Sequence, residues 1–248
     1  MIALADLSTF LDTYLACDTF SDYAPNGVQI EGRDSVSCIV SGVTASQALI
    51  ERAVSERADA VLVHHGYFWK GEDPRLIGMK RRRVELLLRH GINLLAYHLP
   101  LDVHAEVGNN AQFGRHLGFS GEAVDRQGLI WAGTLQEPAA PAQFADHIAR
   151  ALGRAPLHVG PEDASIRRVM WCTGAAQKYL ADAARLGADA FISGEMSEQT
   201  THEARELGVH YFAAGHHATE RYGIAALGAM MAQHFALRHV FVDIDNPA

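Results

Sequence analysis

The chain has 248 residues, of which 48% are apolar, and a formal net charge of −8. This length suits one large domain or two closely joined lobes, and the apolar content is sufficient for a packed core without disulfide bonds. The acidic balance argues against a nonspecific nucleic-acid binder, which normally presents a basic surface. No segment reaches the ~18 consecutive apolar residues that a membrane-spanning helix needs, so no membrane partner is expected.

Cysteine usage and the first residues indicate a cytoplasmic protein. The three cysteines, at positions 17, 38 and 172, form no CxxC pair. Such an odd, scattered set suits a reducing compartment and excludes a thiolate zinc finger on spacing grounds. A basic leader followed by an apolar stretch is missing at the N-terminus, so we expect no signal peptide.

Apolar periodicity and turn signals predict alternating helices and strands in the first half of the chain. Gly91 and Gly118 follow two of the helices, as C-terminal caps often do. The basic run Lys80–Arg83 begins a helix and is interpreted as a solvated first turn, with a local anion-binding patch as the alternative. The predicted elements are helices over 4–15, 46–57, 81–90 and 106–117, and strands over 35–43, 60–63 and 93–97.

The second half continues the alternation after a turn at 138–141 that leads into a helix ending near 152. Strands that alternate with helices predict an α/β fold with largely parallel or mixed sheets. The other predicted elements are strands over 128–135, 167–172, 190–193, 209–213 and 239–243, and helices over 175–186, 201–207 and 218–235.

Two pairs of segments indicate an internal repeat. Residues 47–63 match 177–193 at a constant offset, with the same Ala-Asp-Ala before an apolar strand, and 91–96 parallels 208–213. Chance similarity between two βα units is the alternative, but the matched order of four elements favours duplication. We therefore predict a single α/β domain built of two similar lobes, approximately 1–124 and 125–248, with mixed sheets and a metal site between the lobes.

Fourteen histidines are unusually many, and seven of them lie in three short stretches. His64 and His65 follow one predicted strand, and Asp102 comes five residues after another. His216 and Glu220 follow a third. Because ligand sites in open α/β sheets gather beyond the carboxyl ends of strands, these side chains are the strongest candidates for a shared site.

The types and spacing of these residues predict a pair of divalent metal ions. Side chains of adjacent residues at a strand end diverge, so His64 and His65 suit two neighbouring ions better than one. His216 and Glu220 are four residues apart and share a face once the helix has begun. Three imidazoles and two carboxylates without thiolate favour Zn, Mn or Fe(II) over Ca. Two such ions about 3.5–4 Å apart would acidify a bridging water and supply a hydroxide nucleophile near neutral pH.

Two further residues are candidates for catalytic roles. His98 lies near Asp102 in sequence and is expected either to orient a ligand or water, or to be a satisfied core histidine. Glu195 occupies the place of His65 in the repeat, so it is either a general base in the same cleft or a buried hydrogen-bonding group. The roles of His104 and His202 stay open. The aromatic run 67–69 is expected either to pack or to stack on a flat substrate.

Five motifs also carry a resemblance that spans nearly the whole chain. In order they are Asp22–Gln29 (DYAPNGVQ), His64-His65-Gly66, Tyr97–Asp102 (YHLPLD), Ser193-Gly194-Glu195 and Gly215–Glu220 (GHHATE). This set resembles the Nif-three-like family, also known as GTP cyclohydrolase I type 2 homologues, in its compact bacterial form. The resemblance implies a dinuclear centre in which His64 and His216 bind one ion, His65 and Asp102 bind the other, and Glu220 bridges them. It also implies a homo-oligomer in the form of a toroidal hexamer.

These observations leave two functions open. The first is a metal-dependent hydrolase acting on a nucleotide-like, phosphoester or C–N substrate, for which the resemblance implies GTP cyclohydrolase-like chemistry. The second is a non-catalytic ring protein, either a metal-dependent regulatory or interaction protein or one that handles metal ions. Neither a Walker A loop nor a dinucleotide fingerprint is present, so a nucleotide would be held by other means.

Overall fold

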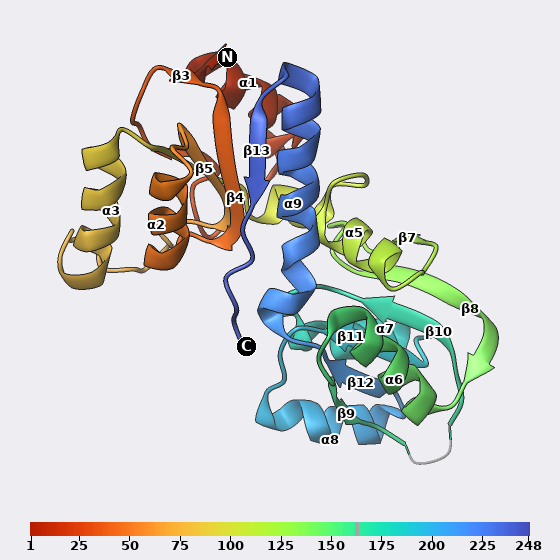
Figure 1. The fold of residues 1–248 in the computed structure, drawn as a ribbon. Helices are drawn as coiled ribbons and strands as arrows, with labels where there is room; N and C mark the ends of the chain where they lie inside the picture. Colours follow the sequence, from red (N-terminus) through yellow and green to blue (C-terminus); the bar gives the residue numbers. More distant parts are fainter. Residues whose placement is uncertain (162–163) are drawn as a thin grey trace. The chain divides into compact units, whose positions relative to one another are not determined.

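The computed structural model describes residues 1–161 and 164–248, which form two compact units (Figure 1). Unit 1 comprises residues 1–101 and 224–245, and unit 2 comprises residues 102–223 and 246–248. Helices α4 (Leu99–Val103) and α9 (His216–Phe235) each contain residues of both units. Among the described residues, no helix is both long and apolar enough to traverse a bilayer.

Unit 1 contains a five-stranded mixed sheet in the order β13-β4-β5-β6-β2. Strands β13, β4, β5 and β6 are parallel, and β2 pairs antiparallel with β6 at the edge. Leu49 and Leu87, from the two connecting helices, pack with Val61 in the core of the unit. The strands are β2 (Gly27–Ile30), β4 (Cys38–Thr44), β5 (Ala60–His65), β6 (Asn93–Ala96) and β13 (Arg238–Phe241), and the short β1 (Ile2–Ala3) and β3 (Ser35–Val36) pair separately. The helices are α1 (Leu4–Tyr14), η1 (Cys17–Thr19), α2 (Gln47–Ser55) and α3 (Gly78–His90).

Unit 2 contains a six-stranded mixed sheet in the order β7-β8-β10-β11-β12-β9. Trp171 and Phe212 pack with Ile148 in one core cluster, and Met170 packs with Leu180 in another. The alternation of Met170 and Trp171 along one strand places the two clusters on opposite faces of the sheet. The strands are β7 (Gly121–Ala123), β8 (Trp131–Ala139), β9 (Leu157–Val159), β10 (Ile166–Trp171), β11 (Ala190–Ser193) and β12 (His210–Ala213). The helices are α5 (Asn109–His116), α6 (Pro141–Leu152), η2 (Gln177–Tyr179), α7 (Leu180–Arg185) and α8 (Glu198–Leu207).

The two sheets repeat one arrangement of four strands. In unit 1 the parallel strands β4-β5-β6 carry antiparallel β2 at one edge, and in unit 2 β10-β11-β12 carry antiparallel β9. The registers also correspond, because Ala60 pairs with Asn93 and Ala190 pairs with His210. The similarity between 47–63 and 177–193 therefore reflects the same local topology, and the prediction of an α/β protein with mixed sheets is confirmed.

A carboxylate at the start of the central strand explains the repeated Ala-Asp-Ala. Asp59 Oδ2 accepts hydrogen bonds from the backbone N–H groups of Ser37 and Cys38, at 2.8 and 3.0 Å. Asp189 Oδ2 accepts the equivalent bonds from Arg167 and Arg168, at 2.9 and 2.7 Å. Each aspartate thereby satisfies backbone donors where the neighbouring parallel strand begins.

The two observed units have other boundaries than the predicted lobes 1–124 and 125–248. Strand β13 pairs with β4, and Val240 and Val242 pack against the core of unit 1, so the C-terminal strand belongs to the first sheet. The contacts divide the rest of the chain at Asp102 rather than near 124. The sequence does not reveal the pairing of β13 with β4, because a parallel strand can join a sheet from any distance along the chain.

Two predicted elements were wrong in detail for identifiable reasons. The helix expected over 106–117 begins only at Asn109, because His104 Nδ1 accepts the backbone N–H groups of Glu106 and Val107 and holds a turn there. Pro138, expected in a turn, lies in β8, where the pairing with β10 shifts register between Ile166 and Arg168. Such an irregularity accommodates a proline that cannot donate to the ladder.

Asp59→Asn is expected to lower the free energy of unfolding by about 1–3 kcal/mol at neutral pH. The reason is that the charged carboxylate, which accepts hydrogen bonds from Arg33, Ser37 and Cys38, is replaced by a neutral amide. Burial acts to raise the pKa of Asp59, but hydrogen bonds from Ser37, Cys38 and Arg33 hold it below its usual value. A carboxyl of lowered pKa stabilises the fold above its unfolded pKa of about 3.9, and this contribution is lost as the pH falls through the folded pKa. Urea unfolding followed by circular dichroism should show the deficit shrinking below about pH 4. Exposed Asp34→Asn is the control, and an equal deficit in both variants would contradict the assignment.

Candidate metal centre

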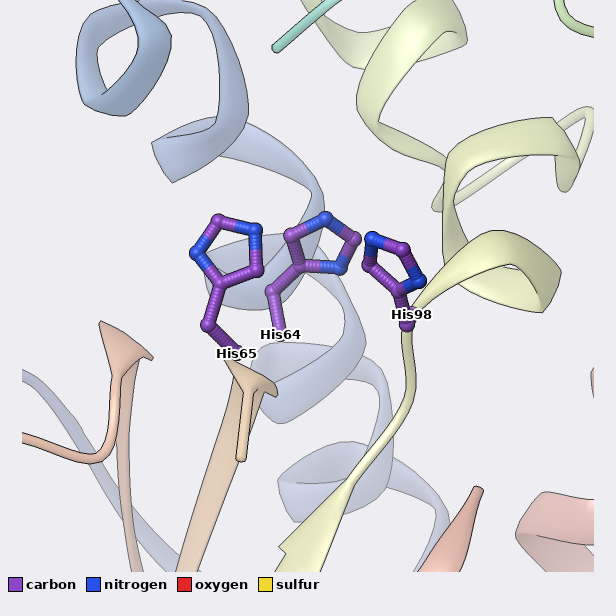
Figure 2. Close-up of side chains that lie close together, drawn as sticks. All are labelled: His64, His65 and His98. Atoms are coloured by element: carbon purple, nitrogen blue, oxygen red, sulfur yellow. The ribbon is translucent and has the colours of Figure 1, made fainter. Parts of the chain in front are cut away.

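Three histidines lie together at the carboxyl ends of neighbouring parallel strands in unit 1. His64 and His65 are the last two residues of β5, and His98 follows β6 after one intervening residue. Figure 2 shows the three imidazoles side by side, and one ring nitrogen from each lies within 4.8 Å of the other two. The ring centroid of His64 is 4.5 Å from that of His65 and 5.0 Å from that of His98.

Gly66 lets the chain turn away directly after the two histidines. A Cβ at this position would overlap Gln29 Oε1 and lie 2.6 Å from the Cβ of Ala96. Gln29 Oε1 accepts the backbone N–H of Tyr67 at 2.7 Å, which fixes the segment after the turn. The motif His64-His65-Gly66 therefore has a steric requirement for glycine at its third position.

Hydrogen bonds at Nδ1 set the orientation of the histidines in unit 1. His64 Nδ1 donates to the backbone carbonyl of Tyr97 at 2.9 Å, since a carbonyl only accepts. His98 Nδ1 lies 2.7 Å from Asp22 Oδ1, and His65 Nδ1 lies 3.3 Å from the Thr44 hydroxyl. A proton on Nδ1 makes Nε2 the nitrogen with the lone pair, which is the usual arrangement of a metal-binding histidine and its partner.

Asp22 is itself held firmly by its neighbours. Its Oδ2 accepts hydrogen bonds from the Asn26 side chain and from the backbone N–H of Leu99, at 3.0 and 2.9 Å. Burial acts to raise the pKa of Asp22, but the hydrogen bonds from His98, Asn26 and Leu99 lower it to about 2. Asn26 Oδ1 also accepts the backbone N–H of His98 at 2.7 Å. The DYAPNGVQ motif thus supplies the residues that hold His98.

Unit 2 places His216 between two glutamates at the start of α9. His216 Nδ1 lies 2.7 Å from Glu195 Oε1, and His216 Nε2 lies 3.1 Å from Glu220 Oε2. Burial acts to lower the pKa of His216, but hydrogen bonds and charge from Glu220 and Glu195 raise it to about 9. The two carboxylates make this position strongly favourable for positive charge.

Two glycines make room for this group of side chains. A Cβ on Gly174 would overlap the Glu220 carboxylate and lie 3.2 Å from His216 Nε2. A Cβ on Gly194 would lie 2.6 Å from the Cα of His216. The backbone N–H of Gly174 donates to the Thr219 hydroxyl at 3.0 Å, which ties this loop to α9. Larger residues at either glycine would fill the space beside His216 and Glu220.

Asp102, also in unit 2, is oriented by two consecutive asparagines. Its Oδ1 accepts the Asn109 side-chain N–H at 2.8 Å, and its backbone carbonyl accepts that of Asn110 at 3.1 Å. Asn110 Oδ1 accepts the backbone N–H of Thr173 at 3.0 Å. All four residues are buried, so the carboxylate is held by a fixed polar network.

The predicted site residues fall into both units, and each set has internal contacts. Unit 1 brings together His64, His65 and His98, and unit 2 brings together His216, Glu220 and Glu195. Glu195 contacts His216 directly. The residues that sequence analysis missed are the polar partners and the glycine that makes space, namely Asp22, Asn26, Asn109, Asn110 and Gly174. Asp22 and Asn26 were visible in the sequence only as members of the motif Asp22–Gln29, with no role assigned to either.

The other histidines and aromatic residues of interest make different contacts. His202 pairs with Glu198 on an exposed face of α8. Tyr67 is buried, and its hydroxyl donates to the carbonyl of Ala45, so it packs rather than faces a ligand. Trp69 contacts the His98 ring edge-on, with centroids 4.9 Å apart. Trp69 is therefore the aromatic residue of 67–69 that borders the histidines.

These features define an α/β protein whose histidines and carboxylates gather beyond the ends of parallel strands, in donor sets that suit divalent metal ions. A model of the family described as Duf34/NIF3 (NGG1p interacting factor 3) matches residues 2–247. The chain therefore belongs to the DUF34/NIF3 family, which confirms the resemblance seen in the motifs.

Individual relatives match over the full length. A protein of Allochromatium vinosum described as "GTP cyclohydrolase 1 type 2 homolog" is 56% identical, over 100% of this chain and 98% of the relative. One of Pseudomonas aeruginosa with the same description is 55% identical, over 100% and 99%. Among solved structures, protein ybgI, described as of unknown function, is 50% identical with a TM-score of 0.95 over 100% of both chains. TTHA1606 from Thermus thermophilus is 34% identical with a TM-score of 0.92, again over 100% of both chains.

Gly174→Ala is expected to destabilise the protein more than an alanine at a comparable glycine. Gly174 and Gly187 have φ of 70° and 84°, but a Cβ on Gly187 would meet nothing within 4 Å. Gly187→Ala should therefore lower the free energy of unfolding only by the cost of placing alanine in the left-handed region, about 1–2 kcal/mol. Gly174→Ala should lower the free energy of unfolding by a further ~1–3 kcal/mol, because the added methyl group crowds Glu220 and His216. Equal losses in urea unfolding would show that the space beside Glu220 is not confined.

Proposed function

We propose that this chain binds two divalent metal ions and uses them to hydrolyse a small substrate. The ligands would come from the five residues predicted from the sequence, namely His64, His65, Asp102, His216 and Glu220, with Glu220 shared by the two ions. The observation that carries the proposal is the fixed orientation of the histidines, in which Nδ1 of His64, His98 and His216 is bonded to a carbonyl or carboxylate. Zn, Mn or Fe suits this mixture of imidazole and carboxylate.

The surroundings of the proposed ligands also fit a cation. Two glutamates flank His216 and raise its pKa, so positive charge is favoured at that position. Gly174 and Gly194 leave space beside His216 that side chains would fill. Asp102 is oriented by Asn109, as metal-binding carboxylates commonly are by a neighbouring donor. The family's GTP cyclohydrolase description adds a hydrolytic reaction and a nucleotide-like substrate to the proposal.

Divalent ions at this site would supply an acidified water near neutral pH. The chain's own residues would set the geometry, with Glu195 positioning the ligand His216 and Asp22 orienting His98 next to the ligands His64 and His65. The catalytic roles expected for His98 and Glu195 stay predictions. Trp69 borders the histidines and would limit access of bulk water from its side.

Assembly into a toroidal homohexamer is proposed from the family. Three large apolar side chains, close together in sequence around the start of α3, are exposed and would be available for association between copies. They are Leu76, Ile77 and Met79, at 49%, 56% and 55% exposure. Light scattering after size-exclusion chromatography should give six times the 27.0 kDa chain mass, and a monomer would contradict the ring. The cytoplasmic location stays a prediction.

Purified protein is expected to carry two metal ions per chain after metal-supplemented growth, measured by elemental analysis of untagged protein. Glu220→Ala should weaken binding at both positions because the bridging carboxylate is lost, whereas Asp102→Ala should mainly empty one. Glu198→Ala, at an exposed carboxylate of α8, is the matched control and should leave the content unchanged. A wild-type chain without metal, or equal effects of Glu220→Ala and Asp102→Ala, would contradict the arrangement.

A broad screen of nucleotides, phosphoesters and C–N substrates with metal-loaded protein tests the hydrolytic part. Activity should fall by at least about a hundredfold in Glu220→Ala and after chelation, because removal of a catalytic electrostatic element costs roughly that much. Activity that persists in the variant would identify a contaminant. Two bound ions with no hydrolysis of any class would overturn the enzymatic proposal in favour of a non-catalytic, metal-dependent ring protein.

A further inference from the structure

We propose that helix α3 of one copy of the chain binds helix α8 of a second copy. An apolar groove beside α3 takes Leu207 of α8, and arginines of α3 face the glutamates of α8. This inference rests on the assembly proposed above and goes beyond it, because it names two different surfaces and the chemistry that joins them. None of the proposed metal ligands takes part in the contact.

The first argument is a groove of about 580 Å³ along α3, which packs beside α2 in unit 1 (Figure 1). Its apolar side chains are Val84, which also belongs to the core of the unit, and the exposed Leu76 and Leu88. Helix positions three or four residues apart share a face, so 81, 84, 85 and 88 form one side of the groove. The lining residues are Leu76, Arg81, Val84, Glu85, Leu88 and Arg89.

The second argument is the positive charge beside this groove. Helix α3 carries five basic side chains and one glutamate, although the whole chain has a net charge of −8. The Glu85 carboxylate lies 2.7 Å from Arg89 Nη2 and 3.2 Å from Arg81 Nη2, so both guanidinium groups are held at the rim. Arg82 is exposed and forms no ion pair within the described ranges. The groove therefore suits a partner that combines an apolar side chain with carboxylates.

The third argument is a surface of that kind in unit 2. Helix α8 carries three glutamates and one arginine. Leu207 is 45% exposed in the last turn of α8, where Glu203 and Glu206 precede it by four residues and one residue. Neither glutamate forms an ion pair with any residue that the structure describes. This end of α8 thus presents an apolar side chain beside two carboxylates that are available to a partner.

The other large apolar side chains exposed in the described part of unit 2 lack this combination. Leu186 follows Arg185, which pairs with Asp182. Leu157 has no acidic residue within four positions of it. Charge therefore distinguishes the end of α8 as the surface of this chain that complements the groove of α3.

The two kinds of contact would have different roles. Burial of Leu207 between Leu76 and Leu88 supplies affinity, because isolated ion pairs at a surface contribute little. The carboxylates opposite Arg82 and Arg89 set the orientation and exclude wrong pairings. Such an arrangement, with an apolar centre and a charged rim, is the usual composition of a protein interface.

A contact between unlike surfaces leaves one α3 and one α8 free on each pair of copies. Each free surface can bind a further copy, and such a series closes into a ring when the rotation between copies allows it. A two-fold contact between two α3 helices would instead bring two positively charged surfaces together. The distribution of charge therefore favours the head-to-tail contact.

The test is light scattering after size-exclusion chromatography of the full chain with charges reversed in pairs. Arg82→Glu with Arg89→Glu should raise the concentration at which half of the assembly dissociates by at least about a hundredfold, because carboxylates would then face carboxylates. Glu203→Arg with Glu206→Arg should have the same effect. A chain with all four reversals should assemble within about tenfold of the wild type, because each attraction returns with its signs exchanged.

Two further variants serve as controls. Arg126→Glu with Arg150→Glu reverses two exposed arginines outside both helices and should leave the assembly unchanged. Leu207→Asp should dissociate the assembly without any reversal of an arginine, because a charged side chain would enter the apolar groove. Circular dichroism checks that each variant is folded.

A wild-type chain that stays monomeric would overturn the inference, as would an assembly that survives either pair of reversals. Failure of the fourfold variant to assemble, after both pairs had dissociated the wild type, would show that the two surfaces do not face each other. Elemental analysis of the same samples keeps the metal centre separate. A monomeric wild type that carries two metal ions would refute the contact and leave the proposed metal centre intact.

Discussion

Hydrogen bonds from Nδ1 hold the imidazoles of His64, His98 and His216 in defined orientations, and the chemistry proposed for this protein depends on them. The acceptors are a main-chain carbonyl and two carboxylates. Each bond decides which nitrogen carries the proton and which one faces a cation. Without these partners neither the tautomer nor the ring orientation of the histidines would be fixed, and metal affinity would be lower.

The sheets explain why these residues can converge at all. Parallel strands align their carboxyl ends, so the residues that follow neighbouring strands share one edge of the sheet. In unit 1 this edge carries His64, His65 and His98, and in unit 2 it carries Glu195 and His216. Asp59 and Asp189 stabilise the opposite ends of the same strands. In both sheets, structural carboxylates therefore lie at the amino ends of the strands, and the candidate metal-site residues lie at the carboxyl ends.

Much of this arrangement was predictable from sequence because it depends on local patterns. The periodicity of 4–15 and the apolar run 190–193 predicted α1 and β11 closely, and the histidine pair after a strand predicted the candidate ligands. The edge strands β2 and β9 are only four and three residues long, too short for a clear alternation. The partner of His98 is Asp22, 76 residues away, and the spacing of neither residue contains that information. Long-range hydrogen bonds of this kind become visible only once the chain is folded.

The pairing of β13 with β4 has a consequence for how the protein is made. Cys38 and its neighbour Arg238 are 200 residues apart, so a ribosome adding about 5–20 residues per second needs roughly 10–40 s to supply the second strand after the first. During that interval β4 presents an open edge, which is a template for pairing with other nascent chains. The order of synthesis therefore leaves the sheet of unit 1 incomplete until residues 238–241 have been made.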